Sequence, residues 1–264
     1  MATAAGAAVT KLHDGVQSSW SPDGRCLALS EAGGGEPGGL NPYADVVVVR
    51  YGIRSSQRGH EVARIFSDAK MNFGPSWAPD ARQLVFSSAE ADESWLLTSP
   101  IGGGSPEELT PFVDWTQSPV SFHDDEAPVW SPDGNTIAFS RRTVRYTASD
   151  KTVFGVSHLY VIRPDGKGLR LVPRTAGAHN PSWSPDARRL AFDSSGRIAV
   201  VNVQSGVRRD LTTPKAQRDS DPAWAPNGQT IAFVRSGDIW TMSATGTKQR
   251  LFVQKGTQPA WRPR

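Results

Sequence analysis

One pattern of apolar and polar positions recurs along the chain. A tryptophan is followed by a short polar turn, and an apolar triplet such as Ile137-Ala138-Phe139 begins seven residues after the tryptophan. The pattern starts at Trp20, Trp77, Trp130, Trp183 and Trp224, and a last fragment starts at Trp261. Successive tryptophans are 57, 53, 53, 41 and 37 residues apart. Repeats of this length indicate one supersecondary unit per repeat.

The residues after each tryptophan predict a tight turn. Pro follows at the second position, Asp or Asn at the third and usually Gly at the fourth, as in Pro132-Asp133-Gly134. Pro presets φ at the first corner, Asp bonds its own backbone, and Gly accepts positive φ. A strand that ends at each tryptophan is therefore turned into a second, apolar strand.

Two further strands are expected in each repeat. Third strands are predicted at Val46–Arg50, Trp95–Thr98, His158–Ile162, Arg197–Val203 and Asp238–Met242. Fourth strands are predicted at Glu61–Phe66, Glu107–Thr110, Gly168–Val172, Val207–Leu211 and Lys248–Val253. Four antiparallel strands per repeat are typical of a β-propeller blade. We therefore expect an all-β chain in which residues 1–264 form a single propeller domain.

The repeat resembles the TolB-type propeller repeat, which is WD40-like and is also called PD40. The resemblance covers about residues 8–262 and is carried by the Trp-Ser-Pro-Asp-Gly turn and the apolar triplet. It implies that the chain stops on the first strand of a blade, which the start of the chain then completes. We expect five full blades and an incomplete sixth, built from Thr257–Trp261 and Val9–Leu12. The alternatives are a five-bladed ring with an unpaired terminal segment and a chain that has lost its true N-terminus.

An incomplete blade leaves a sheet edge unpaired. Such an edge accepts a strand from a second molecule. The chain is accordingly expected to be a monomer, or a dimer joined through the incomplete blade.

The connections of a four-stranded meander fall on two faces of the ring. The tight turns share one face, and the long insertions Glu31–Ala44, Pro111–Glu126 and Arg141–Ser157 share the other. Long loops on a rigid scaffold commonly carry binding sites. We expect the site on this long-loop face, around the mouth of the central channel.

Charge is patterned along the chain, although its formal sum is only +3. Residues 61–126 carry 12 acidic and 3 basic side chains, whereas residues 141–189 carry 10 basic and 3 acidic ones. Such asymmetry steers a charged partner, or it is simply uneven solvated surface. The small sum gives no support for nucleic-acid binding. No apolar run is long enough for a membrane span, no signal peptide is recognisable, and the single Cys26 fits a reducing, cytoplasmic location.

The string from His123 to Glu126 has the most reactive composition. His123, Asp124, Glu126 and the repeat-related His179 are the candidate acid–base groups of a catalytic site. His123, Asp125, Glu126 and His179 are the candidate ligands of a divalent metal, although no cofactor is our first expectation. The alternative is a polar channel filled with water.

Six other residues are candidates for ligand binding. They are Trp115, Arg141, Arg142, Tyr146, Asn180 and Asp221. Trp115 lies in a long loop where the repeat requires no aromatic residue, and arginines bind carboxylate or phosphate through two parallel hydrogen bonds. Each has a structural alternative, such as anchoring a loop or lying in solvent.

Two functions follow from these features. The first is a non-enzymatic scaffold that binds a protein or peptide, or a small polar ligand, at the long-loop face. The second is a lyase or hydrolase at the same channel mouth, because related propellers include polysaccharide lyases and the non-catalytic domain of certain peptidases. The sequence contains no GxSxG, HExxH, CxxC or phosphate-loop motif that would favour the second.

Overall fold

A computed structural model describes most of the chain between Val16 and Pro263. The described residues are 16–32, 44–51, 60–65, 71–90, 93–111, 121–146, 152–213 and 218–263. Every regular element in these ranges is a β-strand, so none of them is a helix that could cross a membrane. The predicted all-β class is confirmed.

Five sheets follow one another along the chain. Sheet 1 contains β1 (Val16–Trp20), β2 (Cys26–Ala32), β3 (Ala44–Arg50) and β4 (His60–Ile65). Sheet 2 contains β5 (Met71–Trp77), β6 (Gln83–Glu90), β7 (Glu93–Pro100) and β8 (Glu107–Glu108). Sheet 3 contains β9 (Ser121–Trp130), β10 (Ile137–Tyr146), β11 (Thr152–Phe154), β12 (His158–Ile162) and β13 (Arg170–Leu171). Sheet 4 contains β14 (Ala178–Trp183), β15 (Arg189–Ser194), β16 (Arg197–Asn202) and β17 (Arg208–Asp210). Sheet 5 contains β18 (Asp219–Trp224), β19 (Thr230–Arg235), β20 (Asp238–Ser243) and β21 (Arg250–Val253).

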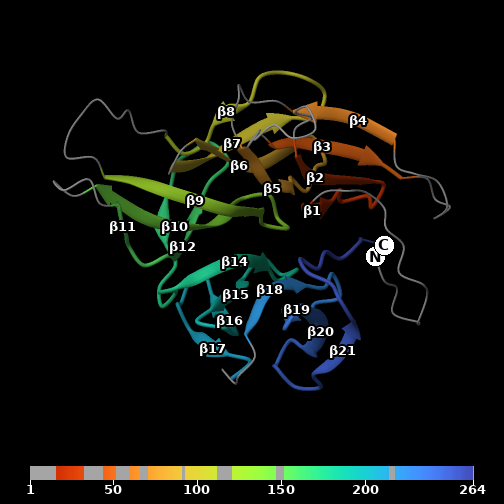
Figure 1. Ribbon diagram of the computed structural model, residues 1–264, viewed down its shortest axis with the longest axis vertical. Helices are drawn as coiled ribbons and strands as arrows, with labels where there is room; N and C mark the ends of the chain where they lie inside the picture. Colours follow the sequence, from red (N-terminus) through yellow and green to blue (C-terminus); the bar gives the residue numbers. More distant parts are fainter. Residues whose placement is uncertain are drawn as a thin grey trace, which may run out of the picture.

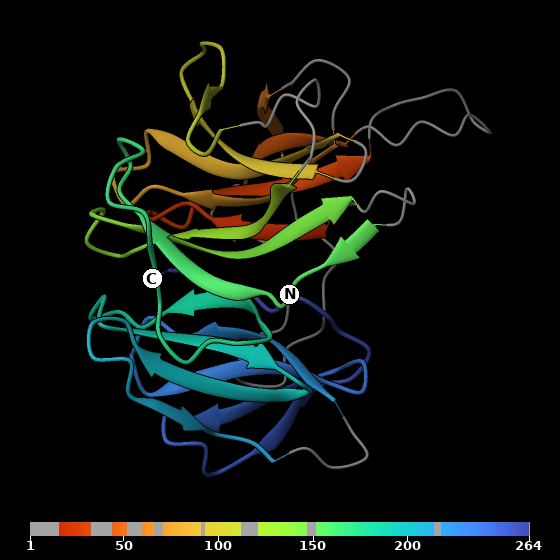
Figure 2. The ribbon, with the colours of Figure 1, turned by 90° about the vertical axis from the view of Figure 1, so that its left-hand side faces the viewer.

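The sheets are arranged around a common centre. The first strands β1, β5, β9, β14 and β18 lie innermost, and β4, β8, β17 and β21 lie at the rim (Figure 1). Seen from the side, the strands run across the ring from one face to the other (Figure 2). Strands within a sheet pair antiparallel, and single parallel bridges, Ala44 to Met71 and Ser94 to Asp124, join sheets 1, 2 and 3.

The repeated tryptophans lock neighbouring sheets together. The indole of Trp77 donates to the carbonyl oxygen of Ser19 at 3.1 Å, and Trp183 donates to Val129 at 3.1 Å. In both pairs the acceptor is the residue just before the tryptophan of the preceding sheet. Between the sheets lie apolar clusters, such as Val161, Trp183 and Phe192 between sheets 3 and 4. Burying each sheet on both faces explains why every second strand carries the apolar triplet.

The turn after each tryptophan is built as its residues predict. In sheet 3 the hydroxyl of Ser131 donates to Asp133 at 2.6 Å, and the N–H of Asn135 donates to the same carboxylate at 3.1 Å. Gly134 has a φ of 73°, in the region that glycine adopts without strain. The aspartates of these turns are therefore structural.

Replacing Asp133 with alanine is expected to lower the free energy of unfolding by about 1 kcal/mol, because its hydrogen bonds with Ser131 and with the N–H and side-chain amide of Asn135 are lost. Asp133→Asn is the matched control and should cost less, since Asn227 occupies this position in sheet 5 and accepts from the N–H of Gln229. Partial burial favours the neutral form of Asp133, but the bonds from Ser131 and Asn135 outweigh it and lower its pKa below 3.8. The deficit should therefore shrink as the pH falls below 4 in urea titrations; an Asn variant as unstable as the Ala variant would contradict this account.

Sheet 3 is longer than the sequence predicts. We expected loops up to Glu126 and from Arg141 onward, but β9 begins at Ser121 and β10 continues to Tyr146. The extra strand β11 pairs with the far end of β10, and β12 pairs with its near end. Runs of consecutive polar residues hid this extension, because its first two strands carry Asp124, Asp125 and the two arginines opposite them.

The last tryptophan lies between sheets 5 and 1 and closes the ring. Residues 257–263, the closing segment, form no strand within the described chain. Trp261 donates to the carbonyl of Ala223 in sheet 5 at 2.9 Å, which repeats the contact of Trp77 and Trp183. On the other side, the N–H of Gln17 donates to Oε1 of Gln258, and Nε of Arg262 donates to the carbonyl of Gly24. Trp261 therefore makes the contact of a repeat tryptophan, while the incomplete sixth blade stays a prediction, since Val9–Leu12 lies outside the described residues.

Candidate functional site

All first strands begin at the same end of the ring, and each carries a bulge there. The bulged residue stands three before the tryptophan and has φ between 50° and 64° at Gln17, Gly74, Ala127, Asn180, Asp221 and Gln258. Gly, Asn and Asp tolerate this left-handed conformation best. The polar residues Gln17, Asn180, Asp221 and Gln258 at this offset are thus partly a consequence of backbone geometry. The signal for the bulge was present as Gly74, Asn180 and Asp221 at one offset from tryptophan.

A buried ion pair joins β9 and β10 at this end of the ring. Arg141 binds Asp125 through Nε and Nη2, each 2.6 Å from a carboxylate oxygen, and Asp125 is only 1% exposed. The guanidinium also lies over the rings of Phe139 and Tyr160, 5.2 and 5.4 Å from their centroids. Arg141 is therefore fully engaged inside sheet 3.

Sheet 5 repeats this ion pair at equivalent positions. Arg235 binds Asp219 at 2.6 and 2.8 Å and lies over Phe233 and Trp240. In both sheets the aspartate stands five residues before the repeat tryptophan and the arginine eleven after it. The sequence itself therefore contains a signal for this ion pair, in the spacing of Asp and Arg from the tryptophan.

A second ion pair connects three sheets. Asp124 of sheet 3 accepts hydrogen bonds from Arg142 on β10 and from Ser94 of sheet 2. Arg142 also lies over the ring of Phe154, 4.4 Å from its centroid. On the other side, β14 packs against β9 and β10, and the charges of Arg142 and Asp124 act on His179. Two of the predicted catalytic residues, Asp124 and His179, are therefore brought together with Arg142.

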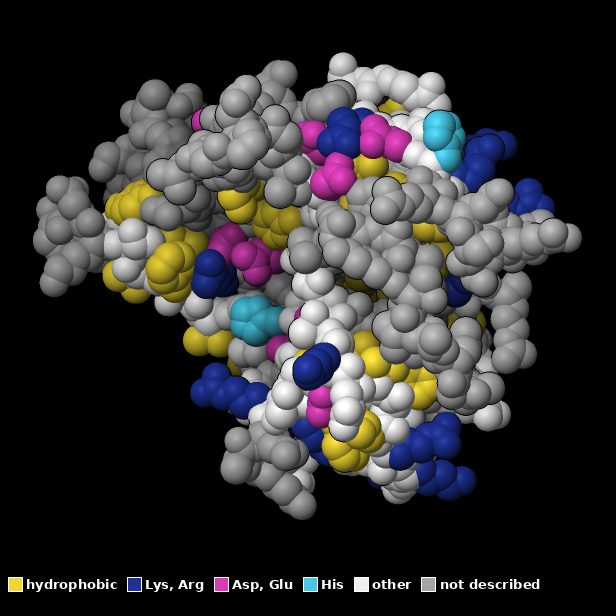
Figure 3. Space-filling view, turned by 45° about the vertical axis from the view of Figure 1, so that its right-hand side comes forward, with side chains coloured by type: hydrophobic (Ala, Val, Ile, Leu, Met, Phe, Trp, Pro, Cys, Tyr) yellow, Lys and Arg dark blue, Asp and Glu magenta, His cyan; other side chains and the backbone are white. Residues whose placement is uncertain are grey.

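Three further titratable groups at this end, His123, Glu126 and His179, are shifted toward their neutral forms. Burial lowers the pKa of His123, and Arg141 lowers it further. Burial likewise lowers the pKa of His179, with a further contribution from Arg142. Burial raises the pKa of Glu126, and the negative charge of Asp124 adds to that effect. A space-filling view shows acidic, basic and histidine side chains gathered near the middle of the ring (Figure 3).

Sheets 4 and 5 meet at a carboxylate that the sequence analysis did not single out. Asp193 on β15 accepts a hydrogen bond from the side-chain amide of Asn180 at 2.9 Å and from the N–H of Asp221 at 3.3 Å. The carboxylate of Asp221 in turn accepts a bond from Ser220 at 2.6 Å. Burial raises the pKa of Asp193 to about 6, and the negative charge of Asp221 acts in the same direction. Two predicted ligand-binding residues, Asn180 and Asp221, are thus joined through Asp193.

The raised pKa of Asp193 predicts a pH-dependent stability. In the folded chain Asp193 keeps its proton up to about pH 6, whereas its ordinary pKa is 3.8. Stability should therefore fall as the pH rises from about 4 to 6, by about 2–3 kcal/mol in total. In Asp193→Asn this fall should be absent, so the variant gains stability relative to wild type above pH 6. Urea unfolding of both proteins between pH 4 and 8 tests this; parallel pH profiles would contradict it.

The other predicted residues are placed as follows. Tyr146 ends β10, and its ring lies 5.6 Å from that of Phe122. Trp115 lies outside the described residues. Within the described part of the chain, no three His, Cys, Asp or Glu side chains are grouped so that they could hold a metal ion.

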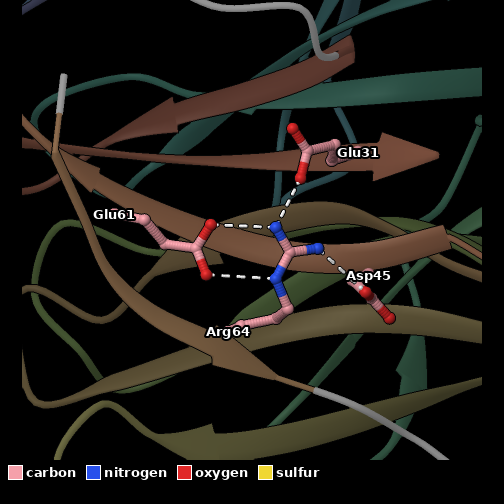
Figure 4. Close-up of polar contacts among 4 residues, drawn as sticks. All are labelled: Glu31, Asp45, Glu61 and Arg64. Carbon is pink, nitrogen blue, oxygen red and sulfur yellow. Dashed lines mark hydrogen bonds and ion pairs between the residues drawn. The ribbon is translucent and has the colours of Figure 1, made fainter. Parts of the chain in front are cut away.

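One arginine of sheet 1 is surrounded by three carboxylates at the same end of the ring. Arg64 on β4 binds Glu61 at 2.8 and 3.0 Å, Asp45 on β3 at 3.0 Å and Glu31 on β2 at 2.6 Å (Figure 4). The hydrogen bonds with these carboxylates raise the pKa of Arg64, and the bond with Glu61 contributes most. The group ties three strands together and leaves this part of the surface negative.

A cleft of about 480 Å³ separates β4 from the turn between β7 and β8. Its lining includes Val62, Ile65 and Ile101 with the glycines Gly102, Gly103 and Gly104. It lies away from the acid–base groups described above, and none of the predicted site residues lines it.

The chain is similar to curated proteins over part of their length. It is 29% identical over 150 residues, or 55% of this chain and 44% of that protein, to the uncharacterized protein Atu1656 of Agrobacterium fabrum. It is 28% identical over 221 residues, or 79% of this chain and 27% of that protein, to the uncharacterized peptidase YuxL of Bacillus subtilis. The chain thus spans less than half the length of these relatives. No protein-family model matches it.

Solved structures establish the fold. TolB from Acinetobacter baumannii aligns with a TM-score of 0.66 at 18% identity, over 94% of this chain and 57% of that one. A TolB structure from Agrobacterium tumefaciens aligns with a TM-score of 0.65 at 20% identity, over 92% of this chain and 83% of that one. An oligogalacturonate lyase in complex with manganese aligns with a TM-score of 0.57 at 14% identity, over 89% and 64%. The chain has a TolB-like propeller fold.

Proposed function

We propose that this chain is a non-enzymatic scaffold that binds a protein or peptide at the channel mouth on the long-loop face. The main support for this proposal is that two acidic residues of β9 are already bound to arginines. Asp124 and Asp125 are each bound to an arginine of β10 and are almost fully buried. Carboxylates in such pairs build a rigid platform, and they are poor candidates for acid–base catalysis or metal binding.

Polar groups from three sheets remain on this platform for a ligand. Arg142 is 35% exposed, Tyr146 is partly exposed at the end of β10, and Asn180 and Asp221 stand on the bulges of β14 and β18. Residues on strand ends hold their positions more rigidly than loop residues do, which favours preorganised binding. Trp115 is included as a candidate on its sequence position alone. A propeller fold by itself is compatible with many functions.

Selection from a random peptide library tests this proposal. Enriched peptides would be measured by isothermal titration against wild type, Arg142→Ala and Asp221→Ala. Each variant is expected to weaken binding about tenfold, because a polar contact to the ligand is lost. Arg82→Ala, an exposed arginine of sheet 2, is the matched control and should bind as wild type does. Enriched peptides that bind all four proteins equally would remove the channel mouth from the proposal.

A lyase or hydrolase at the same mouth is the second candidate. It is favoured by Asp193, whose pKa of about 6 makes it able to exchange a proton near neutral pH. A divalent metal at the mouth would require His123, Glu126 and His179 to move closer together, because these side chains are not grouped as metal ligands in the described part of the chain. Titration of Mn²⁺ into wild type and His179→Ala separates the two functions: heat that wild type gives and the variant lacks favours the metal enzyme, and no heat with either favours the scaffold.

A further inference from the structure

The outer rim between sheets 3 and 4 carries a dense group of arginines. Residues 170–174, which include β13, lie against residues 203–208, which lead into β17. Nη1 of Arg170 donates to the carbonyl of Val203 at 3.1 Å, and Nη1 of Arg208 donates to the carbonyl of Arg174 at 3.2 Å. Gly206 approaches Pro173 so closely that a Cβ there would lie 2.8 Å from it. We call this surface, with Arg170, Arg174, Arg197 and Arg208, the arginine seam.

One carboxylate is shared within the seam. Asp210 accepts from Arg197 at 2.9 Å and from Arg208 at 2.9 Å, and no other described carboxylate pairs with the four arginines. Partial burial favours the neutral form of Asp210, but the two arginines outweigh it and lower its pKa. The seam thus holds four arginines and one paired carboxylate, which binds two of them. The arrangement is the reverse of that around Arg64, where three carboxylates surround one arginine.

Much of the hydrogen-bonding capacity of the seam is unused within the described chain. A guanidinium carries five N–H donors. The side chain of Arg170 makes one hydrogen bond, to a main-chain carbonyl, and that of Arg174 makes none with any described residue. Both residues are exposed. The paired N–H donors of a guanidinium match the two oxygens of a carboxylate. An anion that binds between neighbouring arginines also reduces the repulsion between their positive charges.

The surroundings of the seam favour a polypeptide over a nucleic acid. Val207, beside Arg208, is 65% exposed, and Leu169 and Leu171 of the β13 region are 43% and 44% exposed. Apolar side chains beside arginines fit the mixed surface of a protein partner. A nucleic acid extending beyond the seam would meet the acidic half of the ring, where residues 61–126 carry nine more acidic than basic side chains.

We propose that the arginine seam binds an acidic polypeptide segment of a partner protein, through paired contacts between guanidinium groups and carboxylates. This is a second interaction surface, at the rim of the ring, and it uses none of the residues proposed at the channel mouth. An experiment can therefore refute either proposal without affecting the other.

Fluorescence anisotropy with a defined probe tests the proposal. The probe is a labelled ten-residue peptide of alternating Glu and Val, compared with its Gln/Val counterpart and with a single-stranded oligonucleotide of equal charge. Wild type should bind the Glu/Val peptide, and binding should weaken as salt rises from about 0.05 to 0.3 M. Arg174→Glu should weaken binding at least about tenfold, and Arg174→Lys much less, because lysine keeps the charge but loses the fork.

Two further variants make the result specific. Arg82→Glu changes the net charge equally but lies on sheet 2, and it should bind as wild type does. Arg170→Glu, at the other exposed arginine of the seam, should weaken binding as Arg174→Glu does and covers the case in which that variant fails to fold. Equal loss in Arg82→Glu, tighter binding of the oligonucleotide, or no binding of the peptide at low salt would each overturn the proposal.

Discussion

Replacing Arg141 with methionine is expected to lower the free energy of unfolding by about 3–5 kcal/mol at neutral pH. The substitution keeps much of the apolar volume over Phe139 and Tyr160 but leaves the buried Asp125 without its cation. A buried carboxylate with no positive partner retains most of its desolvation cost. Guanidinium unfolding followed by tryptophan fluorescence measures the change.

The pH dependence of this deficit identifies its cause. Burial already raises the pKa of Asp125 and Arg141 opposes that effect, so the pKa should rise further without the arginine. The deficit should therefore be largest at neutral pH and shrink as the pH falls toward 4, because the folded variant then binds a proton at Asp125 and no longer buries an unpaired charge. Arg163→Met is the control, because Arg163 and Asp165 form an exposed pair, and it should change stability little. A deficit that is constant from pH 4 to 8 would point to lost packing as its cause.

Replacing both Trp261 and Arg262 with alanine is expected to cost about 3–5 kcal/mol, because the ring loses the closing segment. Trp261 contacts sheet 5 through Ala223 and Phe252, and Arg262 lies over Trp20 of sheet 1. Hydrogen exchange should accelerate first in β1 and β18, the strands on either side of the segment. Sheet 3, on the far side of the ring, should keep its protection until global unfolding.

The control for the closing segment is a variant elsewhere in the chain with a comparable loss of stability. Phe192→Ala removes a fully buried ring between sheets 3 and 4 and should cost a similar amount. Its exchange should not be faster at β1 and β18 than elsewhere. If both variants gave the same exchange pattern, the closing segment would be no more than another part of the core.

Much of the fold was predictable because the repeat acts locally. Pro132, Asp133 and Gly134 define their turn through contacts within a few residues, and each apolar triplet lies where a second strand is observed. The extension of sheet 3 was missed for the opposite reason. Asp124 and Asp125 read as loop residues, and only their pairing with Arg142 and Arg141, sixteen or more residues away, makes them strand residues.

The sequence predicts the end of the ring at which the candidate residues lie, but it does not predict the partners of their side chains. The repeat placed His179, Asn180 and Asp221 at one end of the ring, and the structure brings them together there. The sequence repeat could not show that Arg141 is bound to a buried carboxylate, or that Asp193 links sheets 4 and 5. A side chain's partners depend on the register between strands and on the neighbouring sheet, which a single repeat does not encode.

The amino-acid sequence by itself determined the unit, its turn and the number of times it recurs, because these depend on residues close together in the chain. Only the tertiary structure decided which charges remain available. It pairs Asp124 and Asp125 with arginines, surrounds Arg64 with three carboxylates, and binds Arg197 and Arg208 to Asp210. The physical reason is that electrostatic energy depends on distance and burial, and both are set only when the sheets close into a ring.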